Sequence, residues 1–232
     1  MKMKRNEFIR YSVSAFSAAL IPRFLFGNSA LQKLPNVLLL GDSISIGYTP
    51  FVRELLKAKA NVFRPVLENG NPENCEGTTK GIVEINRWIG TGDWDIIHFN
   101  FGLHDIKHVH PSTGETSSDS NDPLQASLDQ YVKNMNFIVE RLKNTGAKLI
   151  FATTTPVPDG NLSTLREPEN VIKYNKAARK IMKKEHIAVN DLYAFTLPKL
   201  KEIQKSDNVH FTDAGNEVIA REVAAKISEL ML

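Results

Sequence analysis

The sequence predicts an α/β protein built on a mostly parallel, five-stranded sheet with helices on both faces. Two observations support this prediction. Strand and helix patterns alternate from about residue 36 onward, and residues 37–40 (VLLL) form an uninterrupted apolar run, as a strand covered on both faces should. Alternation of this kind is typical of parallel strands joined by helical crossovers. Ligands in such folds bind at the carboxyl ends of the strands, so chemistry is expected there.

Five strands and five helices are expected in order. Pro65 places the second strand at a sheet edge, and Pro50 is expected to open the first helix, where a proline is tolerated. Gly146 ends the third helix and Thr212 caps the last one. The polar, turn-rich segment 108–123 indicates a long surface loop. The expected strands span residues 37–40, 61–67, 94–101, 147–155 and 187–191, and the expected helices 50–60, 79–89, 122–146, 169–186 and 212–232.

The first 30 residues have the character of an export signal, and residues 31–232 are expected to form a single domain. A basic start precedes an apolar stretch that is too short and too interrupted to span a membrane. An amphipathic first helix is the alternative for this segment. Without it, the chain holds 24 basic and 25 acidic side chains, so no nucleic-acid-binding face is implied. We therefore expect an exported, periplasmic or extracellular protein with no stable membrane span.

Cys75 is the only cysteine, so neither an intramolecular disulfide nor a cysteine zinc cluster can form. The nearby sequence contains nothing that would obviously lower the pKa of its thiol, so a small buried or loop cysteine is the favoured interpretation over a nucleophile.

The first strand runs into Gly41-Asp42-Ser43, and this junction has three interpretations. A dinucleotide loop requires Gly-x-Gly-x-x-Gly, but the next glycine is Gly47; a P-loop also fails, because Gly47 is misplaced and followed by Tyr48. A serine at a strand-to-helix turn can instead expose its hydroxyl as a nucleophile. Ser43 alone could equally be a capping or turn residue.

A nucleophilic serine needs a histidine base that a carboxylate orients, and the chain offers two Asp-x-x-His stretches. Asp207 and His210 precede the last helix, where a fold of this kind can return a base toward the first strand. Asp105 and His108 follow the third strand. We favour the pair Asp207 and His210, since His108 is expected to be solvated; the alternative makes Asp207 a capping residue and His210 a surface residue.

His104, just after the third strand, can donate a hydrogen bond to the oxygen that becomes negatively charged during acyl transfer. His104, His108 and His110 could instead bind a metal. Lys107 lies within this group and no second carboxylate-rich strand end completes it, so we expect no metal and no cofactor.

These residues together resemble the SGNH (GDSL-type) hydrolase superfamily over nearly the whole chain from residue 36. Gly41-Asp42-Ser43-Ile44 is similar to its first block, Gly102-Leu103-His104-Asp105 to its Gly-x-Asn-Asp block, and Asp207-Asn208-Val209-His210 to its terminal Asp-x-x-His block. The resemblance implies a flavodoxin-like α/β/α sandwich and ester hydrolysis through an acyl-serine intermediate. It implies that Ser43 is the nucleophile, His210 the general base and acid, and Asp207 the residue that orients His210.

The resemblance also implies an oxyanion hole formed by Ser43, a glycine of the second block and an asparagine of the third. His104 stands where that asparagine is expected, and Asn100 is an alternative donor. Gly77 and Gly81 both fit the second block, and Gly77 is preferred because it precedes a helix. Asp42 and Asp105 belong to these blocks and Asn100 lies just before one of them, and all three are possible substrate contacts.

We expect a serine esterase that removes acetyl or other short acyl groups from small-molecule or polysaccharide substrates. A lysophospholipase or thioesterase of the same fold is the first alternative. A non-catalytic carbohydrate-binding module, which the His104 departure suggests, is the second, and metal-dependent hydrolysis through the histidine cluster is the third. The sequence does not give the oligomeric state.

Overall fold

A computed structural model describes residues 33–158, 162 and 164–231. The expected export signal, residues 1–30, lies outside the described residues. Among the described residues, no helix combines the length and the apolar character needed to cross a bilayer.

The centre of the unit 34–232 is a parallel five-stranded sheet in the order β2-β1-β3-β4-β5. Each pairing is parallel, and the register of Val37 with Ile96 and of Ile96 with Lys148 aligns the carboxyl ends of the three central strands. The sheet prediction is confirmed, including the edge position of the proline-flanked second strand. The strands are β1 (Asn36–Leu40), β2 (Asn61–Phe63), β3 (Ile96–Phe99), β4 (Lys148–Ala152) and β5 (Ala188–Asn190).

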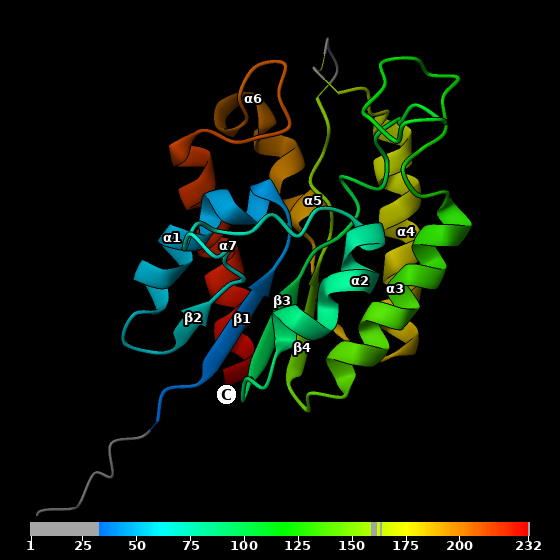
Figure 1. Ribbon diagram of the computed structural model, residues 1–232. Coiled ribbons are helices and arrows are strands. Elements are labelled where there is room, and N and C mark those ends of the chain that lie inside the picture. The colour runs from blue at the N-terminus through cyan, green and yellow to red at the C-terminus, as the bar shows by residue number, and fades with distance from the viewer. Residues whose placement is uncertain (1–32, 159–161, 163, 232) are drawn as a thin grey trace, which may run out of the picture. The chain divides into compact units, whose positions relative to one another are not determined.

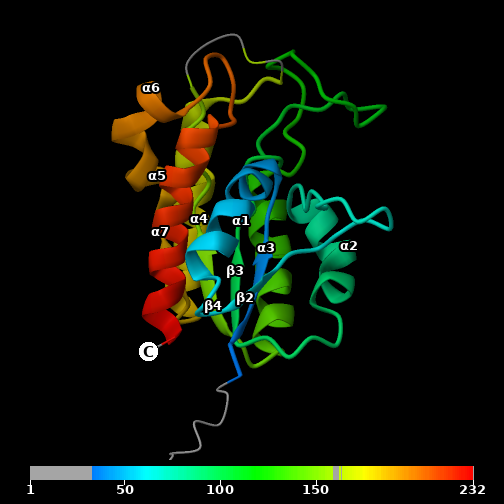
Figure 2. The same cartoon turned by 90° about the vertical axis from the view of Figure 1, so that its left-hand side faces the viewer.

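Helices cover the two faces of this sheet, giving the three layers expected (Figure 1, Figure 2). Helix α1 packs against α7 on one side, while α2 packs against α3 on the other, and α4 packs against α3 and β5. Each long helix buries an apolar stripe against the sheet, because parallel strands need cover on both faces. These helices are α1 (Ser43–Leu56), α2 (Thr78–Ile89), α3 (Leu128–Lys143), α4 (Pro168–Lys184) and α7 (Asp213–Met231).

Several bounds differ from the sequence prediction: β2 is shorter than the expected strand 61–67, and α3 begins at Leu128 and not at residue 122. Helix α1 begins at Ser43, directly after β1, so Pro50 lies inside it and does not open it. Asp42 makes this early start possible, because its Oδ1 accepts a hydrogen bond from the Ile44 amide at 2.9 Å. Burial of Tyr48 and Val52 offsets the backbone hydrogen bond that the proline removes. The short helices α5 (Leu192–Thr196) and α6 (Leu200–Ile203), with the 3₁₀ turn η1 (Leu197–Lys199) between them, were not expected.

The core is continuous across the layers. The side chains of β1 are almost fully buried, as are most of those on β3 and β4, and Phe99 packs against Phe151. Burial on both faces explains the uninterrupted apolar run of the first strand. The polar residues that follow these strands are therefore held on a rigid edge.

Candidate active site

Ser43 and His210 meet at the carboxyl edge of the sheet. Ser43 is the first residue of α1, and His210 lies in the loop that leads into α7. Because α1 packs against α7, these two helix starts lie side by side, and the Ser43 Oγ is 2.8 Å from the His210 Nε2. That is hydrogen-bonding distance between a hydroxyl and the base that would remove its proton.

The other ring nitrogen of His210 is held by Asn208. The Asn208 Oδ1 lies 2.7 Å from the His210 Nδ1 and also accepts the His210 backbone N–H at 2.9 Å. An amide oxygen only accepts, so Nδ1 carries the proton and Nε2 is free to accept one from Ser43. The asparagine thus fixes the tautomer that a general base requires.

Asp207, the orienting residue expected from the terminal block, is placed differently. Its side chain is exposed, its backbone is in the left-handed region with φ 50°, and in the described part of the chain no hydrogen bond joins it to His210. The positive φ turns the chain so that the following residue, Asn208, faces the imidazole. Asp207 does line the cavity beside Ser43.

The charge state of His210 suits a base. Partial burial, together with the positive charges of Lys205 and Arg166, lowers its pKa from the usual 6.5. The imidazole is therefore neutral at neutral pH and can accept the Ser43 proton.

A cavity of about 330 Å³ opens beside this pair. It lies at the lower end of the range typical of small-ligand sites. Two larger hollows, beside β5 and beside α6, contain neither Ser43 nor His210. The cavity beside Ser43 is consequently the candidate substrate site. Its polar lining residues are Ser43, Asn74, His104, Thr164, Arg166, Asp207, Asn208 and His210.

His104 lines this cavity, as the sequence suggested. Gly102, with φ 152°, turns the chain at the end of β3 in a conformation that side-chain-bearing residues rarely adopt. Burial, aided by the charges of Arg166 and Lys107, lowers the pKa of His104 to about 4. The ring is therefore neutral and has one N–H to donate. Its Nδ1 is buried with no hydrogen-bond partner among the described residues.

The second-block segment reaches the cavity through Asn74, whereas Gly77 is the residue that caps α2. Gly77 packs closely on Asp105: an added Cβ would lie 2.9 Å from the Asp105 Oδ2. Gly81, the other candidate, lies inside α2. The structure therefore places Gly77 at the start of α2 and outside the residues that line the cavity.

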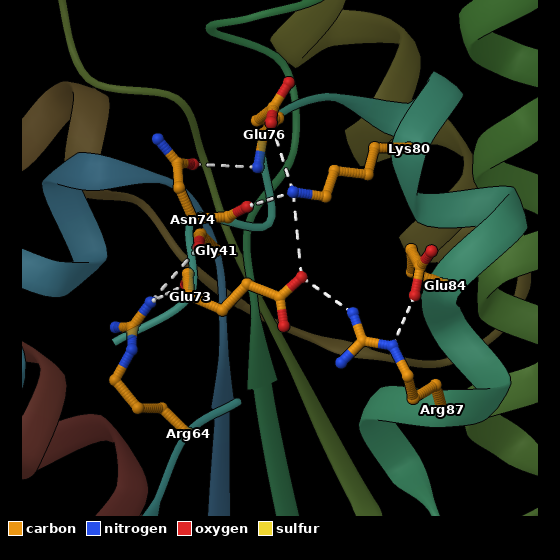
Figure 3. A network of polar contacts seen from close by, with 8 residues as sticks. All are labelled: Gly41, Arg64, Glu73, Asn74, Glu76, Lys80, Glu84 and Arg87. Atoms are coloured by element: carbon orange, nitrogen blue, oxygen red, sulfur yellow. Dashed lines mark hydrogen bonds and ion pairs between the residues drawn. The ribbon is translucent and has the colours of Figure 1, made fainter. Parts of the chain in front are cut away.

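A polar network fixes this segment to the turn that presents Ser43 (Figure 3). The Arg64 guanidinium, on the chain after β2, donates to the carbonyls of Gly41 at 3.4 Å and Glu73 at 2.8 Å. The Lys80 Nζ donates to the Asn74 carbonyl at 2.9 Å, and the Glu73 carboxylate pairs with Arg87 at 2.7 Å. These contacts position Asn74 relative to Ser43.

The three possible substrate contacts make internal hydrogen bonds, and none of them is among the residues that line this cavity. Asp42 caps α1, and the Asn100 side chain donates to the Ala152 carbonyl at 2.7 Å. Asp105 accepts hydrogen bonds from the Thr78 backbone N–H at 2.9 Å and from its hydroxyl at 2.5 Å. Burial raises the pKa of both aspartates to about 6. Contact with substrate remains a prediction for all three.

The other two histidines of the cluster, His108 and His110, differ in their exposure to solvent. His108 was expected to be solvated, and that expectation is wrong: it is buried, with one ring nitrogen 2.6 Å from the Asp122 carbonyl oxygen and the other 2.9 Å from Glu167. His110 is exposed and bonds to Ser112. Within the described ranges, no group of three His, Cys, Asp or Glu side chains could hold a metal ion.

Two cavity residues have no distinctive signal in the sequence. Arg166 lies in a polar loop after β4, where a basic residue is unremarkable, and Asn208 is the variable position of an Asp-x-x-His block. Only the three-dimensional path of their loops brings them to Ser43.

The profile of the GDSL-like lipase/acylhydrolase family matches residues 39–218, and the chain belongs to this family. Family membership makes it a hydrolase of acyl esters, and the parallel five-stranded architecture is the SGNH hydrolase fold. No curated protein matches the sequence significantly.

Solved structures agree with this assignment of the fold. An acetyl xylan esterase, AlAXEase, superposes with a TM-score of 0.64 at 17% identity, over 83% of this chain and 99% of that one. The lipase/acylhydrolase from Enterococcus faecalis gives 0.65 at 19%, over 84% and 96%. A carbohydrate esterase family 3 protein from Talaromyces cellulolyticus gives 0.61 at 16%, over 85% and 98%.

Proposed function

We propose that this protein is a serine esterase that removes acetyl or other short acyl groups from carbohydrates. The observation that supports it most directly is the hydrogen bond between Ser43 and His210 beside a small, polar cavity. A serine hydroxyl bonded to a neutral, oriented imidazole is the arrangement that covalent acyl transfer requires.

In the proposed reaction, the Ser43 Oγ attacks the ester carbonyl carbon while the His210 Nε2 takes the hydroxyl proton. The negative oxygen is stabilised by the Ser43 amide at the start of α1 and by the neutral His104. The carbon–oxygen bond of the alcohol then breaks, and that oxygen receives the proton from His210. A water molecule then attacks the acyl carbon while the His210 Nε2 takes one of its protons. The bond between the acyl carbon and the Ser43 Oγ breaks, the acid leaves, and His210 gives the proton to the Ser43 Oγ.

The substrate assignment depends on the cavity. A volume of about 330 Å³ suits a short acyl group, and its lining of hydroxyl, amide and charged groups suits a polar alcohol. Two fold neighbours are an acetyl xylan esterase and a carbohydrate esterase, which favours the same class. The first 30 residues, a basic start followed by an apolar stretch, favour export to the periplasm or the extracellular space. Polymeric carbohydrates are substrates that an exported enzyme would meet there.

Hydrolysis of p-nitrophenyl acetate by wild type, Ser43→Ala and the exposed control Ser118→Ala tests the proposal. We expect activity in wild type and in the control, and its loss in Ser43→Ala. Labelling by an organophosphonate, followed by mapping of the modified peptide, should identify Ser43. Equal hydrolysis by wild type and Ser43→Ala would refute the serine mechanism.

A series of p-nitrophenyl esters from acetyl to palmitoyl separates the proposal from the lysophospholipase or thioesterase alternative. A carbohydrate acetylesterase should lose activity steadily beyond butyryl, since the cavity is small. A rise in activity toward long chains would favour the alternative. Absence of both hydrolysis and phosphonate labelling would favour a non-catalytic binding module.

A further inference from the structure

A guanidinium group lies in the wall of the cavity that contains Ser43 and His210. Arg166 comes from the loop between β4 and α4, and its Nε donates to the Leu103 carbonyl oxygen at 2.8 Å. Leu103 directly precedes His104 and also lines the cavity. The arginine is therefore anchored to the segment that carries His104.

The rest of this guanidinium has no partner in the part of the chain that the structure describes. Its two terminal nitrogens make neither a hydrogen bond nor an ion pair there. The adjacent carboxylate of Glu167 is occupied by His108 and Asn170. Asp42 attracts Arg166 electrostatically but forms no ion pair with it.

The unpaired end of this arginine keeps contact with solvent, so a ligand can reach it. Its side chain is half-buried, and the loss of solvent lowers its pKa, although a guanidinium stays charged in proteins. Its planar fork of donors matches a carboxylate, which can accept two parallel hydrogen bonds. Among the described residues that line the cavity, Asp207 is the one acidic side chain, and it is exposed.

We propose that Arg166 binds a carboxylate on the alcohol part of the substrate, so that the preferred ester is an acetylated sugar acid. This inference builds on the esterase proposed above and narrows its substrate. The arginine lies in the same cavity as the nucleophile, and that cavity is small. One sugar ring would therefore present its ester to Ser43 and its carboxylate to Arg166.

A matched pair of substrates tests the inference: an O-acetylated methyl glucuronoside and the corresponding uronamide, which has the same shape without the charge. In wild type we expect a higher kcat/KM for the acid. At pH 8, where His210 is neutral in either form, Arg166→Gln should lower kcat/KM for the acid at least about tenfold more than kcat/KM for the amide. Lys107→Gln, which removes a nearby cation that does not line the cavity, should keep the preference for the acid.

A binding measurement separates this inference from the esterase proposal. Calorimetry with Ser43→Ala and methyl glucuronoside needs no turnover, and the additional change Arg166→Gln should abolish the binding. Equal kinetic losses on acid and amide would overturn the inference and assign Arg166 to the transition state. The inference would also be overturned if wild type showed no preference for the acid. Equal binding of methyl glucuronoside and its amide by Ser43→Ala would overturn it as well.

Discussion

The imidazole of His210 is held by the side chain of Asn208, whose Oδ1 lies 2.7 Å from Nδ1. The resemblance assigns this position to Asp207, which is exposed in the structure. An amide oxygen can fix the ring and its tautomer, but it provides less stabilisation than a carboxylate to the imidazolium that forms during catalysis. The side chain that holds the His210 ring is therefore neutral.

Replacement of each residue separately should show which one orients His210. We expect Asn208→Ala to lower kcat/KM for p-nitrophenyl acetate about ten- to hundredfold, because the ring loses its fixed tautomer. Asp207→Ala should change it less than about threefold. Asn208→Asp should keep activity and move the acid limb of the pH profile upward, because a carboxylate raises the pKa of His210. The reverse ranking of the two alanine variants would return the orienting role to Asp207.

The pH dependence of activity should follow His210. The folded-state pKa of this group is below 6.5, owing to burial and to the charges of Lys205 and Arg166. The midpoint of the decline in activity on a neutral substrate should therefore lie below pH 6.5. Removal of a nearby cation raises the pKa, so Lys205→Gln should move the decline to higher pH. A midpoint of kcat/KM at or above 6.5 in wild type would contradict this prediction.

His104 can be tested by its conservative replacement. If its N–H stabilises the oxyanion, His104→Ala should lower kcat about 10²- to 10³-fold, and His104→Asn, which restores an amide donor, should retain most of the activity. Its pKa of about 4 also means that the ring should add no second transition to the pH profile between pH 5 and 8. Full activity in His104→Ala would exclude His104 from the oxyanion hole.

Asp42 should make stability depend on pH. Burial raises its folded-state pKa to about 6 from an ordinary 3.8, so the folded protein binds this proton more tightly than the unfolded chain does. The contribution to stability is present below pH 4 and is lost as pH rises through 6, by about 3 kcal/mol. Urea unfolding of wild type should show about 2 kcal/mol of this loss between pH 4.5 and 7.0. The loss should be smaller in Asp42→Asn and unchanged in the exposed control Glu68→Gln. The same pH dependence in both variants would contradict the prediction.

Much of the fold could be predicted because its signals are local. The apolar run before Gly41 identifies a strand buried on both faces, and Pro65 identifies an edge. The start of α1 was misplaced because Pro50 looks like a first-turn residue, whereas capping by Asp42 and packing on α7 extend the helix backward. Helices α5 and α6 are too short for a periodic pattern.

The residues of the site that belong to sequence motifs could be predicted. Those whose position depends on the conformation of a loop could not. Ser43 and His210 could be paired because strand ends and the final helix converge at one edge of a parallel sheet. Asn208 could not be chosen over Asp207, since the positive φ of Asp207 decides which side chain faces the ring. His108 was expected to be solvated because it begins a polar loop, and its partner Glu167, 59 residues away in the chain, leaves no local signal in the sequence.

Ser43 and His210 are 167 positions apart, so their contact closes almost the entire described chain into one loop. Closing so long a loop costs entropy that only the docked helices can offset, and contacts of this range form slowly. During refolding, the sheet and its local crossovers should therefore form before Ser43 and His210 come into contact. The return of phosphonate labelling at Ser43 would then follow the docking of α7 on α1 and lag behind the recovery of secondary structure.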